Sequence, residues 1–416
     1  MYYTGFDIKN YKGIKLLKLN LIKDPQSKIF TLVGLNESGK TTILEAISLL
    51  NIPDTPHNVH DYIPKSHRIN FNETIDITAR LSFDEKDIET ITEKLKGLGF
   101  KNVKIDKDLM LFKIYQFKDS EHQKGSNKRL CLFNISLSKG KSKTIKKLSD
   151  FKEEDNMIES LILKELIPPI LYYPNFLFDF PEKIFLEETV NESDEQPLYR
   201  EVIGDILSSI DPNLTIEKHI LSRLKANNSD AKRSLDSTLL KMSSKVTKIV
   251  FDAWEAIFDS KGKEIVISYS QDKMDGFYLE FNLKEHSNYY QIAERSLGFR
   301  WFFTFLLFTE FRKNRANNNG EILFMLDEPA SNLHSTAQKK LLQTFEKILK
   351  NSKLIYTTHS HHLINPKWLS GAYIVRNKTV DIDDTIDYSP ESTDIEAVLY
   401  KNFVAAHPNQ RTYFQP

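Results

Sequence analysis

Apolar and polar residues alternate along several stretches of the first third of the chain. This period of two is typical of strands with one buried face, and the stretches are 6–11, 14–22, 74–83, 109–117 and 129–137. Residues 84–98 follow a helical period instead, and Asp84 is suited to cap the first turn of that helix. The pattern therefore predicts an antiparallel β region with an added helix.

Other apolar runs lack this alternation, which is typical of strands covered on both faces. These runs are 29–33, 167–174, 321–326 and 353–357. Stretches with helical spacing lie between these runs, at 43–50, 302–311 and 336–349. Buried strands that alternate with helices at both ends of the chain predict one sheet with a parallel core, assembled from both ends.

Between these parts, residues 197–260 are mainly helical in pattern. Apolar residues step by three and four along one face, at Leu235, Leu239, Met242, Val246, Ile249, Ala253 and Ile257. With 216–224 this segment could form a helical hairpin, whose stripe is either intramolecular core or a partner surface. Residues 264–270 and 277–283 then predict a β-hairpin.

Composition narrows the class of protein. The chain has 416 residues, 40% of them hydrophobic, and its 57 basic and 57 acidic side chains leave no net charge. The whole-chain charge therefore favours neither nucleic acid nor membrane as a partner, although a local basic face remains open. A single cysteine, Cys131, excludes an internal disulfide. With no signal-like start and no bilayer-length apolar run, we expect a soluble cytoplasmic protein.

The strongest chemical motif is Gly34–Thr42, with the sequence GLNESGKTT between an apolar strand and a helix. Strand, G-x-x-x-x-G-K-T and helix together form a phosphate-binding loop. Its small residues let backbone amides surround phosphates, Lys40 reaches the β- and γ-phosphates, and Thr41 can ligate Mg²⁺. The residues expected to bind nucleotide are Asn36, Glu37, Ser38, Gly39, Lys40, Thr41 and Thr42. The motif predicts binding of ATP or another nucleoside triphosphate.

Two acids and a histidine follow later buried strands. Asp327 ends the strand 321–326 and can hold Mg²⁺ together with Thr41, while Glu328 can orient and polarise the attacking water. His359 follows the strand 353–357 and could reach the γ-phosphate region. We therefore expect Lys40, Glu328 and His359 to be catalytic.

Weaker signals remain open between two interpretations. Ser296 and Gly298 begin an apolar helix, either as an ordinary helix cap or as a second anion site. The basic run 139–147 is a solvated loop or a contact to a nucleic-acid backbone. Asp381, Asp383, Asp384 and Asp387 form a solvated acidic loop or part of a metal site.

The order of these motifs resembles the ABC-type ATPases of the RecF/SMC/OLD group. The resemblance rests on IKNYKGI at 8–14, GLNESGKTT, ERSLGFRWF at 294–302, LDEPASNLH at 326–334 and TTHS at 357–360. It covers residues 1–85 and 264–376, and it is most similar to the ATPase domains of overcoming-lysogenization-defect (OLD) nucleases and to PtuA-type anti-phage ATPases.

The resemblance implies an ABC-type P-loop ATPase head of the α/β class, with a mixed sheet, a parallel core, an antiparallel β subdomain and a helical insertion. The implied parts are an N-terminal lobe (1–190), the helical insertion (191–262), a C-terminal lobe (263–376) and a tail suited to docking (377–416). It also implies that two heads enclose ATP and Mg²⁺, with Ser296 and Gly298 of one head completing the site of the other. Ser331–His334 would lie at the dimer seam.

Departures from the family pattern limit what can be transferred. His334 stands where a transporter head carries aspartate, and no Q-loop glutamine can be placed near 172–175. The insertion is too short for an SMC coiled coil, and 377–416 shows no nuclease motif.

Three hypotheses follow. The first is a homodimeric or higher oligomeric ATPase that regulates a separate effector, a nuclease, in anti-phage defence. The second is a RecF/SMC-like DNA clamp in repair, or the ATPase part of an OLD-type nuclease. The third is a scaffold that binds ATP and hydrolyses it negligibly.

Overall fold

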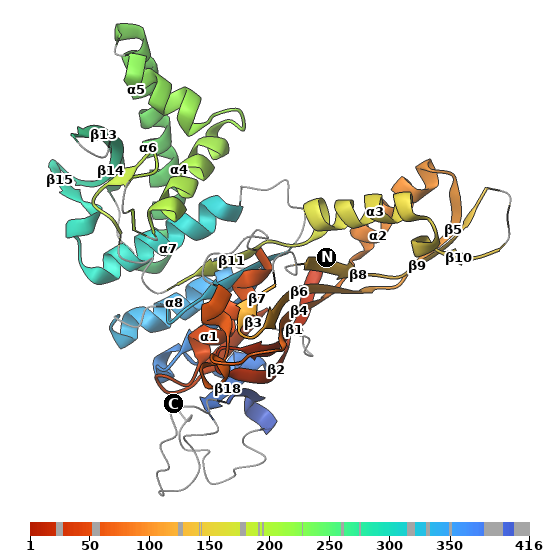
Figure 1. Cartoon of the computed structure of the whole chain (residues 1–416). Helices are drawn as coiled ribbons and strands as arrows, with labels where there is room; N and C mark the ends of the chain where they lie inside the picture. The colour runs from red at the N-terminus through yellow and green to blue at the C-terminus, as the bar shows by residue number, and fades with distance from the viewer. Residues whose placement is uncertain are drawn as a thin grey trace, which may run out of the picture. The chain divides into compact units, whose positions relative to one another are not determined.

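A computed structural model divides the chain into two compact units (Figure 1). The first unit comprises Met1–Tyr173, Gly320–Pro329 and Asn351–Pro416, and the second comprises Pro174–Asn319 and Ala330–Lys350. The structure describes residues 1–21, 28–51, 59–123, 128–140, 142, 144–174, 180–189, 192–193, 195–226, 228–258, 262–273, 276–313, 321–329, 333–348, 352–377 and 394–402. The first unit is thus built from stretches that lie far apart in the sequence.

The central sheet of the first unit has the strand order β11-β16-β17-β3-β18-β19. Its strands are β3 (Ile29–Val33), β11 (Ile170–Tyr173), β16 (Ile322–Leu326), β17 (Ser352–Thr358), β18 (Ala372–Asn377) and β19 (Ile395–Leu399). Neighbouring strands run parallel except β18 and β19, which are antiparallel. The prediction of one parallel core assembled from both ends of the chain is confirmed. Strands β18 and β19 were not among the predicted runs.

Strands β3, β16 and β17 are buried along their whole lengths, as their unbroken apolar runs predict. Strand β17 lies between β16 and β3, so the carboxyl ends of all three strands meet at one edge. Helix α1 (Lys40–Ser48) starts from this edge after β3 and buries Ile43, Leu44, Ala46 and Ile47. The topology therefore gathers the ends of the motif-bearing strands in one place.

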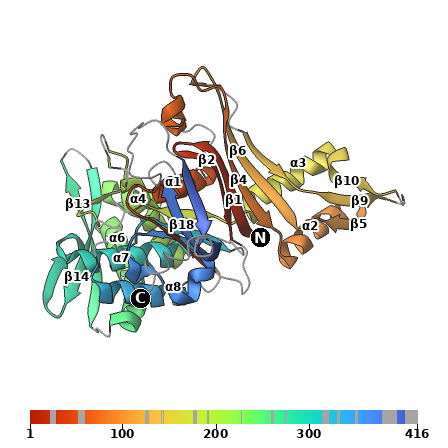
Figure 2. The same cartoon turned by 90° about the horizontal axis from the view of Figure 1, so that it is seen from below.

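The first unit also contains an antiparallel sheet, with the order β2-β1-β4-β6-β7 and with β8 paired to β6 (Figure 2). Its strands are β1 (Tyr2–Tyr11), β2 (Ile14–Asn20), β4 (Thr74–Ser82), β6 (Asp108–Lys118), β7 (Glu121–His122) and β8 (Lys128–Leu132). Along β4, Ile75, Ile77 and Ala79 are buried between half-buried polar neighbours. This confirms the half-buried antiparallel strand that the alternation predicts.

The prediction of one strand over 129–137 is wrong. The first strand, β8, ends at Leu132 and joins the large antiparallel sheet. The second, β9 (Ile135–Lys139), joins a small sheet of order β10-β9-β5. The other strands of this small sheet are β5 (Phe100–Ile105) and β10 (Lys146–Lys147). Alternation continues through both segments, so periodicity alone could not reveal a change of sheet.

Helices α2 (Glu85–Gly97) and α3 (Lys152–Leu161) lie beside the small sheet in both views (Figures 1 and 2). The predicted cap of the first helix is present. The Asp84 carboxylate accepts a hydrogen bond from the amide of Asp87, and the Asp87 carboxylate accepts one from the amide of Asp84, each at 2.9 Å. This reciprocal pair is a capping box, which satisfies two amides at the start of the helix.

The second unit packs helices against an antiparallel sheet of its own, of order β12-β14-β13, with β15 paired to β14. The helices are α4 (Gln196–Ile210), α5 (Ser222–Ala226), α6 (Ser229–Phe258), α7 (Leu297–Lys313) and α8 (Ser335–Ile348). The strands are β12 (Ile184–Phe185), β13 (Lys263–Asp272), β14 (Gly276–Glu285) and β15 (Asn288–Gln291). The predicted hairpin is therefore the pair β13–β14.

The apolar stripe of α6 belongs to the core of this unit. Leu235, Leu239 and Met242 are at most 5% exposed. The next turns also bind the sheet, because the hydroxyls of Ser243 and Thr247 accept hydrogen bonds from backbone amides of β13 at 2.9 and 2.8 Å. Of the two interpretations, intramolecular core is the one observed for these residues.

Short helices occur between the main elements: η1 (Leu49–Asn51), η2 (Val59–Tyr62), η3 (Lys65–His67), η4 (Leu148–Asp150), η5 (Ile162–Leu166), η7 (Glu217–Leu221), η8 (Ile292–Glu294), η9 (His361–Leu363) and η10 (Pro366–Gly371). Among the described residues, no helix is both long enough and apolar enough to cross a membrane.

The packing of α1 generates a stability prediction. Ile43 is fully buried, so Ile43→Ala should leave a cavity and lower the free energy of unfolding by about 2–5 kcal/mol. Leu16 on β2 is 61% exposed, and Leu16→Ala should change it by no more than about 0.5 kcal/mol. Urea unfolding of both variants measures the difference. Equal losses would contradict the packing described for α1.

Candidate functional site

The predicted phosphate-binding loop joins the buried strand β3 to helix α1 in the first unit. Gly39 has a φ of 95°, in the left-handed region that glycine adopts without strain. A Cβ atom on Gly34 would lie 2.3 Å from the carbonyl oxygen of Val375. The backbone conformation therefore requires glycine at position 39, and lack of space requires it at position 34.

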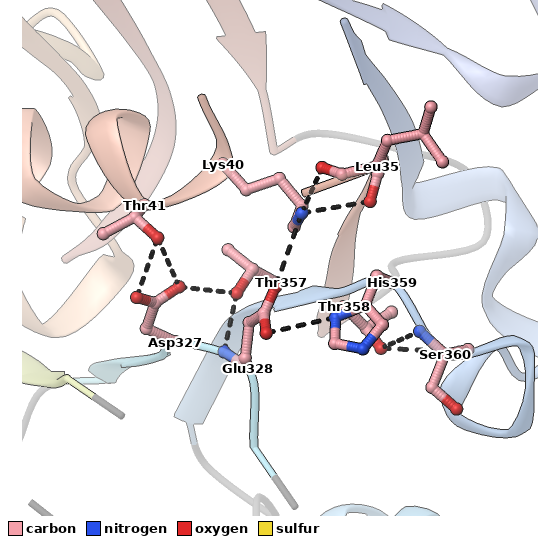
Figure 3. Close-up of polar contacts among 10 residues, drawn as sticks. Leu35, Lys40, Thr41, Asp327, Glu328, Thr357, Thr358, His359 and Ser360 are labelled. Carbon is pink, nitrogen blue, oxygen red and sulfur yellow. Dashed lines mark hydrogen bonds and ion pairs between the residues drawn. The ribbon is translucent and has the colours of Figure 1, made fainter. Parts of the chain in front are cut away.

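Lys40 is only 4% exposed, and its ammonium group is held inside the loop. It donates hydrogen bonds to the carbonyl oxygens of Gly34 and Leu35, at 3.0 and 2.7 Å, and lies 3.4 Å from Oε1 of Glu328 (Figure 3). Burial lowers the pKa of Lys40, and the Glu328 carboxylate opposes this shift. A buried cation at the base of such a loop is suited to bind phosphate oxygens.

Thr41 and Asp327 meet directly although they are 286 residues apart in the sequence. The Thr41 hydroxyl donates to the carboxylate of Asp327, at 3.1 Å from Oδ1 and 2.9 Å from Oδ2 (Figure 3). Asp327 is 6% exposed, and burial raises its pKa, while hydrogen bonds from Thr357 and Thr41 oppose the shift. The structure thus brings together the two residues predicted to hold the metal.

Thr357 is a site residue that the sequence reasoning missed. It is fully buried on β17, where its hydroxyl donates to Oδ1 of Asp327 at 2.7 Å and accepts from the backbone amide of Glu328 at 2.7 Å. One side chain therefore fixes both acids. The only available signal was its place two residues before His359 at the end of an apolar strand, which specifies no role.

The carboxylate of Glu328 lies between two cationic or potentially cationic groups. Its Oε1 atom is near Lys40, and its Oε2 atom lies 3.1 Å from Nδ1 of His359 (Figure 3). The backbone of Glu328 has a φ of 44°, which is strained for a residue other than glycine. Such strain is typical of functional positions, where the surroundings hold a side chain in a required orientation.

The donor set fits Mg²⁺. Mg²⁺ prefers oxygen ligands, and a hydroxyl and a carboxylate are already paired here through Thr41 and Asp327. A cation would also stabilise the charged form of Asp327, whose pKa burial raises. Within the loop, Ser38 Oγ is buried and has no hydrogen-bond partner among the described residues, so it is available to an anion bound there. Thr41 and Asp327 are therefore the residues that would hold the metal.

A cavity of about 520 Å³ opens next to the loop, within the first unit. Glu37, Gly39 and Thr42 of the loop line one side, and Ile395 of β19 lines another. Three cationic side chains also line the cavity: Lys12, Lys65 and Arg68. The acidic side chains of Glu37 and Asp61 line it as well, so the cavity is of mixed charge. A cavity of this size next to a phosphate loop can hold the remainder of a nucleotide.

The other predicted nucleotide-binding residues differ in exposure. Asn36 and Glu37 are exposed at the tip of the loop, whereas Ser38 is buried. Ser296 and Gly298 lie in the second compact unit and are not part of the cluster described above. Ser296 is exposed and caps α7, with its hydroxyl accepting from the amide of Phe299 at 3.4 Å. The simple helix-cap interpretation is therefore observed, and the second-anion role stays a prediction.

Several candidates lie outside the described residues. They are Asn175, Ser331, Asn332, Lys141, Lys143, the aspartates at 381, 383, 384 and 387, and the segment 407–416. Lys139 is described and pairs with Glu154 at 2.9 Å, while Lys146 and Lys147 are exposed on β10. The basic run is thus partly a strand rather than only a loop.

Comparisons with known proteins give one short relative in sequence. The chain is 34% identical over 82 residues to an uncharacterized protein of Methanocaldococcus jannaschii, MJECL43. This match covers 20% of the chain and 21% of that protein, so it spans only about a fifth of the relative's length.

Solved structures with similarity include SMC heads. One is an SMC head bound to the C-winged helix domain of ScpA, with a TM-score of 0.46, 14% identity and coverage of 97% of this chain and 100% of that one. A second, from Pyrococcus furiosus, is an SMC head bound to the C-terminal domain of ScpA, with a TM-score of 0.46, 13% identity and 99% coverage of both chains. The head from Thermotoga maritima has a TM-score of 0.41 and 11% identity, with 96% and 99% coverage.

A family model described as AAA ATPase domain matches residues 1–364. The matched range includes the phosphate loop, both acids and His359, and therefore every residue of the cluster in the first unit.

The position of Thr357 leads to a prediction. Thr357→Val keeps the shape but removes the hydroxyl that positions both acids, so the Mg²⁺ concentration for half-maximal nucleotide hydrolysis should rise about tenfold. Thr358→Val is the matched control, because the hydroxyl of Thr358 bonds only to the backbone of Ser360 among the contacts described. A Mg²⁺ titration measures the effect. An equal response of both variants would exclude the proposed role of Thr357.

Proposed function

Because the chain belongs to the AAA ATPase domain family, we propose that it is a cytoplasmic ABC-type ATPase of the RecF/SMC/OLD group. The observation that supports this most is the joining of Lys40, Asp327 and Glu328 at one edge of the parallel sheet. In our proposal, two copies of the chain enclose ATP and Mg²⁺ and regulate a separate effector.

Each residue of the cluster has a chemical role in this proposal. Lys40 exchanges the carbonyl oxygens of Gly34 and Leu35 for phosphate oxygens when ATP binds. Mg²⁺, when bound, supplies positive charge to the phosphate oxygens. Glu328 orients a water molecule and accepts its proton as the water attacks the γ-phosphorus and the bond to the bridging oxygen breaks, which yields ADP and inorganic phosphate.

His359 has two uses in the same scheme. Its Nδ1 atom lies 3.1 Å from Glu328 Oε2, which keeps the carboxylate in place. At 41% exposure its ring is also accessible to a ligand from outside the loop. We assign it to contact with the γ-phosphate, which would make the position of Glu328 sensitive to that phosphate.

The proposed dimer uses the start of α7. Ser296 is exposed there, and the helix begins at Leu297 and Gly298, where an α-helix offers no partner of its own to the backbone amides. Such a helix end favours anions. We propose that Ser296 and Gly298 of the second subunit meet the γ-phosphate bound by Lys40 of the first, so that ATP binding and dimerisation occur together.

The effector is proposed from the resemblance to OLD nucleases and PtuA-type ATPases. In this proposal the effector is a nuclease and the process is anti-phage defence. ATP would hold the two heads together, and hydrolysis would release them. The parts involved would be the lobes 1–190 and 263–376, with the insertion 191–262 and the segment 377–416 available for docking.

A second candidate function is a DNA clamp. One observation favours it: Lys101, Lys104, Lys146 and Lys147 are all exposed on the small sheet of β5, β9 and β10. Lysines on one sheet can neutralise a phosphate backbone. DNA binding that weakens steeply with salt, and that is lost when these lysines are replaced by glutamine, would favour the clamp.

The proposed role of Glu328 as the base leads to a prediction. Glu328→Gln keeps the side-chain size but cannot accept a proton, so the ATP turnover number should fall by about 10²–10⁴-fold while ATP still binds. Glu321→Gln is the control, because Glu321 precedes the other end of β16 and pairs with Lys353. Steady-state phosphate release measures both variants. Unchanged turnover in Glu328→Gln would remove the assignment of this base.

A site shared between two subunits leads to a further prediction. Ser296→Arg should abolish ATP turnover without weakening ATP binding to the monomer, because Ser296 serves the other subunit. Lys40→Ala should abolish binding in its own subunit. Mixed in equal amounts, the two inactive variants should regain activity, since one of the two sites in a mixed dimer is intact. Failure of any mixture to hydrolyse ATP would argue against a site shared between subunits.

A further inference from the structure

Strand β19 comes from the segment that the sequence suggested as a tail, yet it forms part of the sheet that carries the phosphate loop. Residues 395–399 pair antiparallel with β18, from Ile395 opposite Asn377 to Leu399 opposite Tyr373. An ion pair between Arg376 and Glu396 joins the two strands. A hydrogen bond also fixes the residue before the strand, because the amide of Asp394 donates to Oδ1 of Asn377 at 3.1 Å.

The two faces of β19 have different neighbours. Ile395, Ala397 and Leu399 pack with the large core of the first unit, whereas Val398 and Tyr400 pack with Val33 and Ile374 on the other face. The strand therefore offers two apolar positions, Ile395 and Val398, that belong to one element but face different surroundings.

Ile395 is the residue of β19 that reaches the nucleotide site. Its amide donates to the carbonyl oxygen of Gly13, at 2.9 Å, in the turn next to Lys12. Its side chain covers Gly39, where an added Cβ would lie only 2.3 Å from Ile395 Cδ1. It also lines the cavity with Lys12 and Thr42. Ile395, which is 5% exposed, thus contacts the loop through its side chain and the β1–β2 turn through its amide, and it lines the cavity.

We propose that Ile395 positions the phosphate loop and closes the nucleotide cavity, so that nucleotide binding and the docking of β19 stabilise each other. With β19 docked, Gly39 is covered and the turn at Gly13 is fixed, so less ordering remains to be done when a nucleotide binds. By linkage, a nucleotide then strengthens the docking of β19 by the same factor.

This proposal rests on the proposed binding of ATP but not on the dimer, the effector or hydrolysis. The alternative is that Ile395 is an ordinary core residue, whose replacement only destabilises the sheet. A change on the opposite face of the same strand separates the two, because it weakens β19 without touching Gly39 or the cavity.

The experiment compares Ile395→Ala with Val398→Ala in the full-length chain. Calorimetric titration with the non-hydrolysable analogue AMP-PNP and Mg²⁺ gives the dissociation constants. We expect Ile395→Ala to weaken binding about tenfold and the milder Ile395→Val about threefold, whereas Val398→Ala stays within about twofold of the unaltered chain. Equal weakening by Ile395→Ala and Val398→Ala, or none by Ile395→Ala, would overturn the proposal.

Hydrogen exchange supplies a readout that does not depend on the variants folding well. In the unaltered chain, AMP-PNP should slow exchange of the amides of residues 395–399 more than it slows β8, another edge strand of the same unit. Absence of this added protection would overturn the coupling. If neither the unaltered chain nor Lys40→Ala bound AMP-PNP, the proposed function itself would fail. This outcome is recognised before any variant of β19 is compared.

Discussion

The site depends on one buried carboxylate. Asp327 accepts hydrogen bonds from Thr41 at the start of α1 and from Thr357 on β17, and so ties three separate segments together. Burying a charge costs several kcal/mol, and each hydrogen bond to a charged group returns about 1.5–3 kcal/mol. The balance is incomplete, because burial still raises the pKa of Asp327. A metal ion at this position would offset the remaining cost.

Lys40 and Glu328 form a neighbouring pair of opposite charges, and their charges are also compensated by nearby groups. Lys40 is buried, and two backbone carbonyls together with Glu328 compensate its charge. Glu328 in turn sits on a strained backbone that Thr357 holds through the amide. Strain of this kind costs about 1–3 kcal/mol and persists only where the surroundings impose it. The arrangement keeps a cation and a base in place before any ligand arrives.

The division into two units separates the parts of the proposed mechanism. The phosphate loop, both acids and His359 belong to the first unit, which is itself assembled from distant stretches of sequence, whereas Ser296 and Gly298 start α7 in the second. Strand β19 gives the first unit a further element at the loop, through Ile395. In the proposed mechanism, nucleotide therefore affects two parts of the chain: the loop with β19 in the first unit, and the start of α7 in the second.

The sequence by itself determined the local features: the strand–loop–helix around Gly39 and Lys40, the acids after β16 and the Asp84 cap of α2. These depend on neighbours within a few residues, which the spacing of residue types records. Only the tertiary structure decided that β17 separates β16 from β3, that 129–137 divides between two sheets, and that Ile395 covers Gly39. Strand order and long-range contacts arise from packing between segments far apart in the chain, and such packing leaves no periodic trace in either segment. For the same reason Thr357, which holds both acids, could not be recognised beforehand.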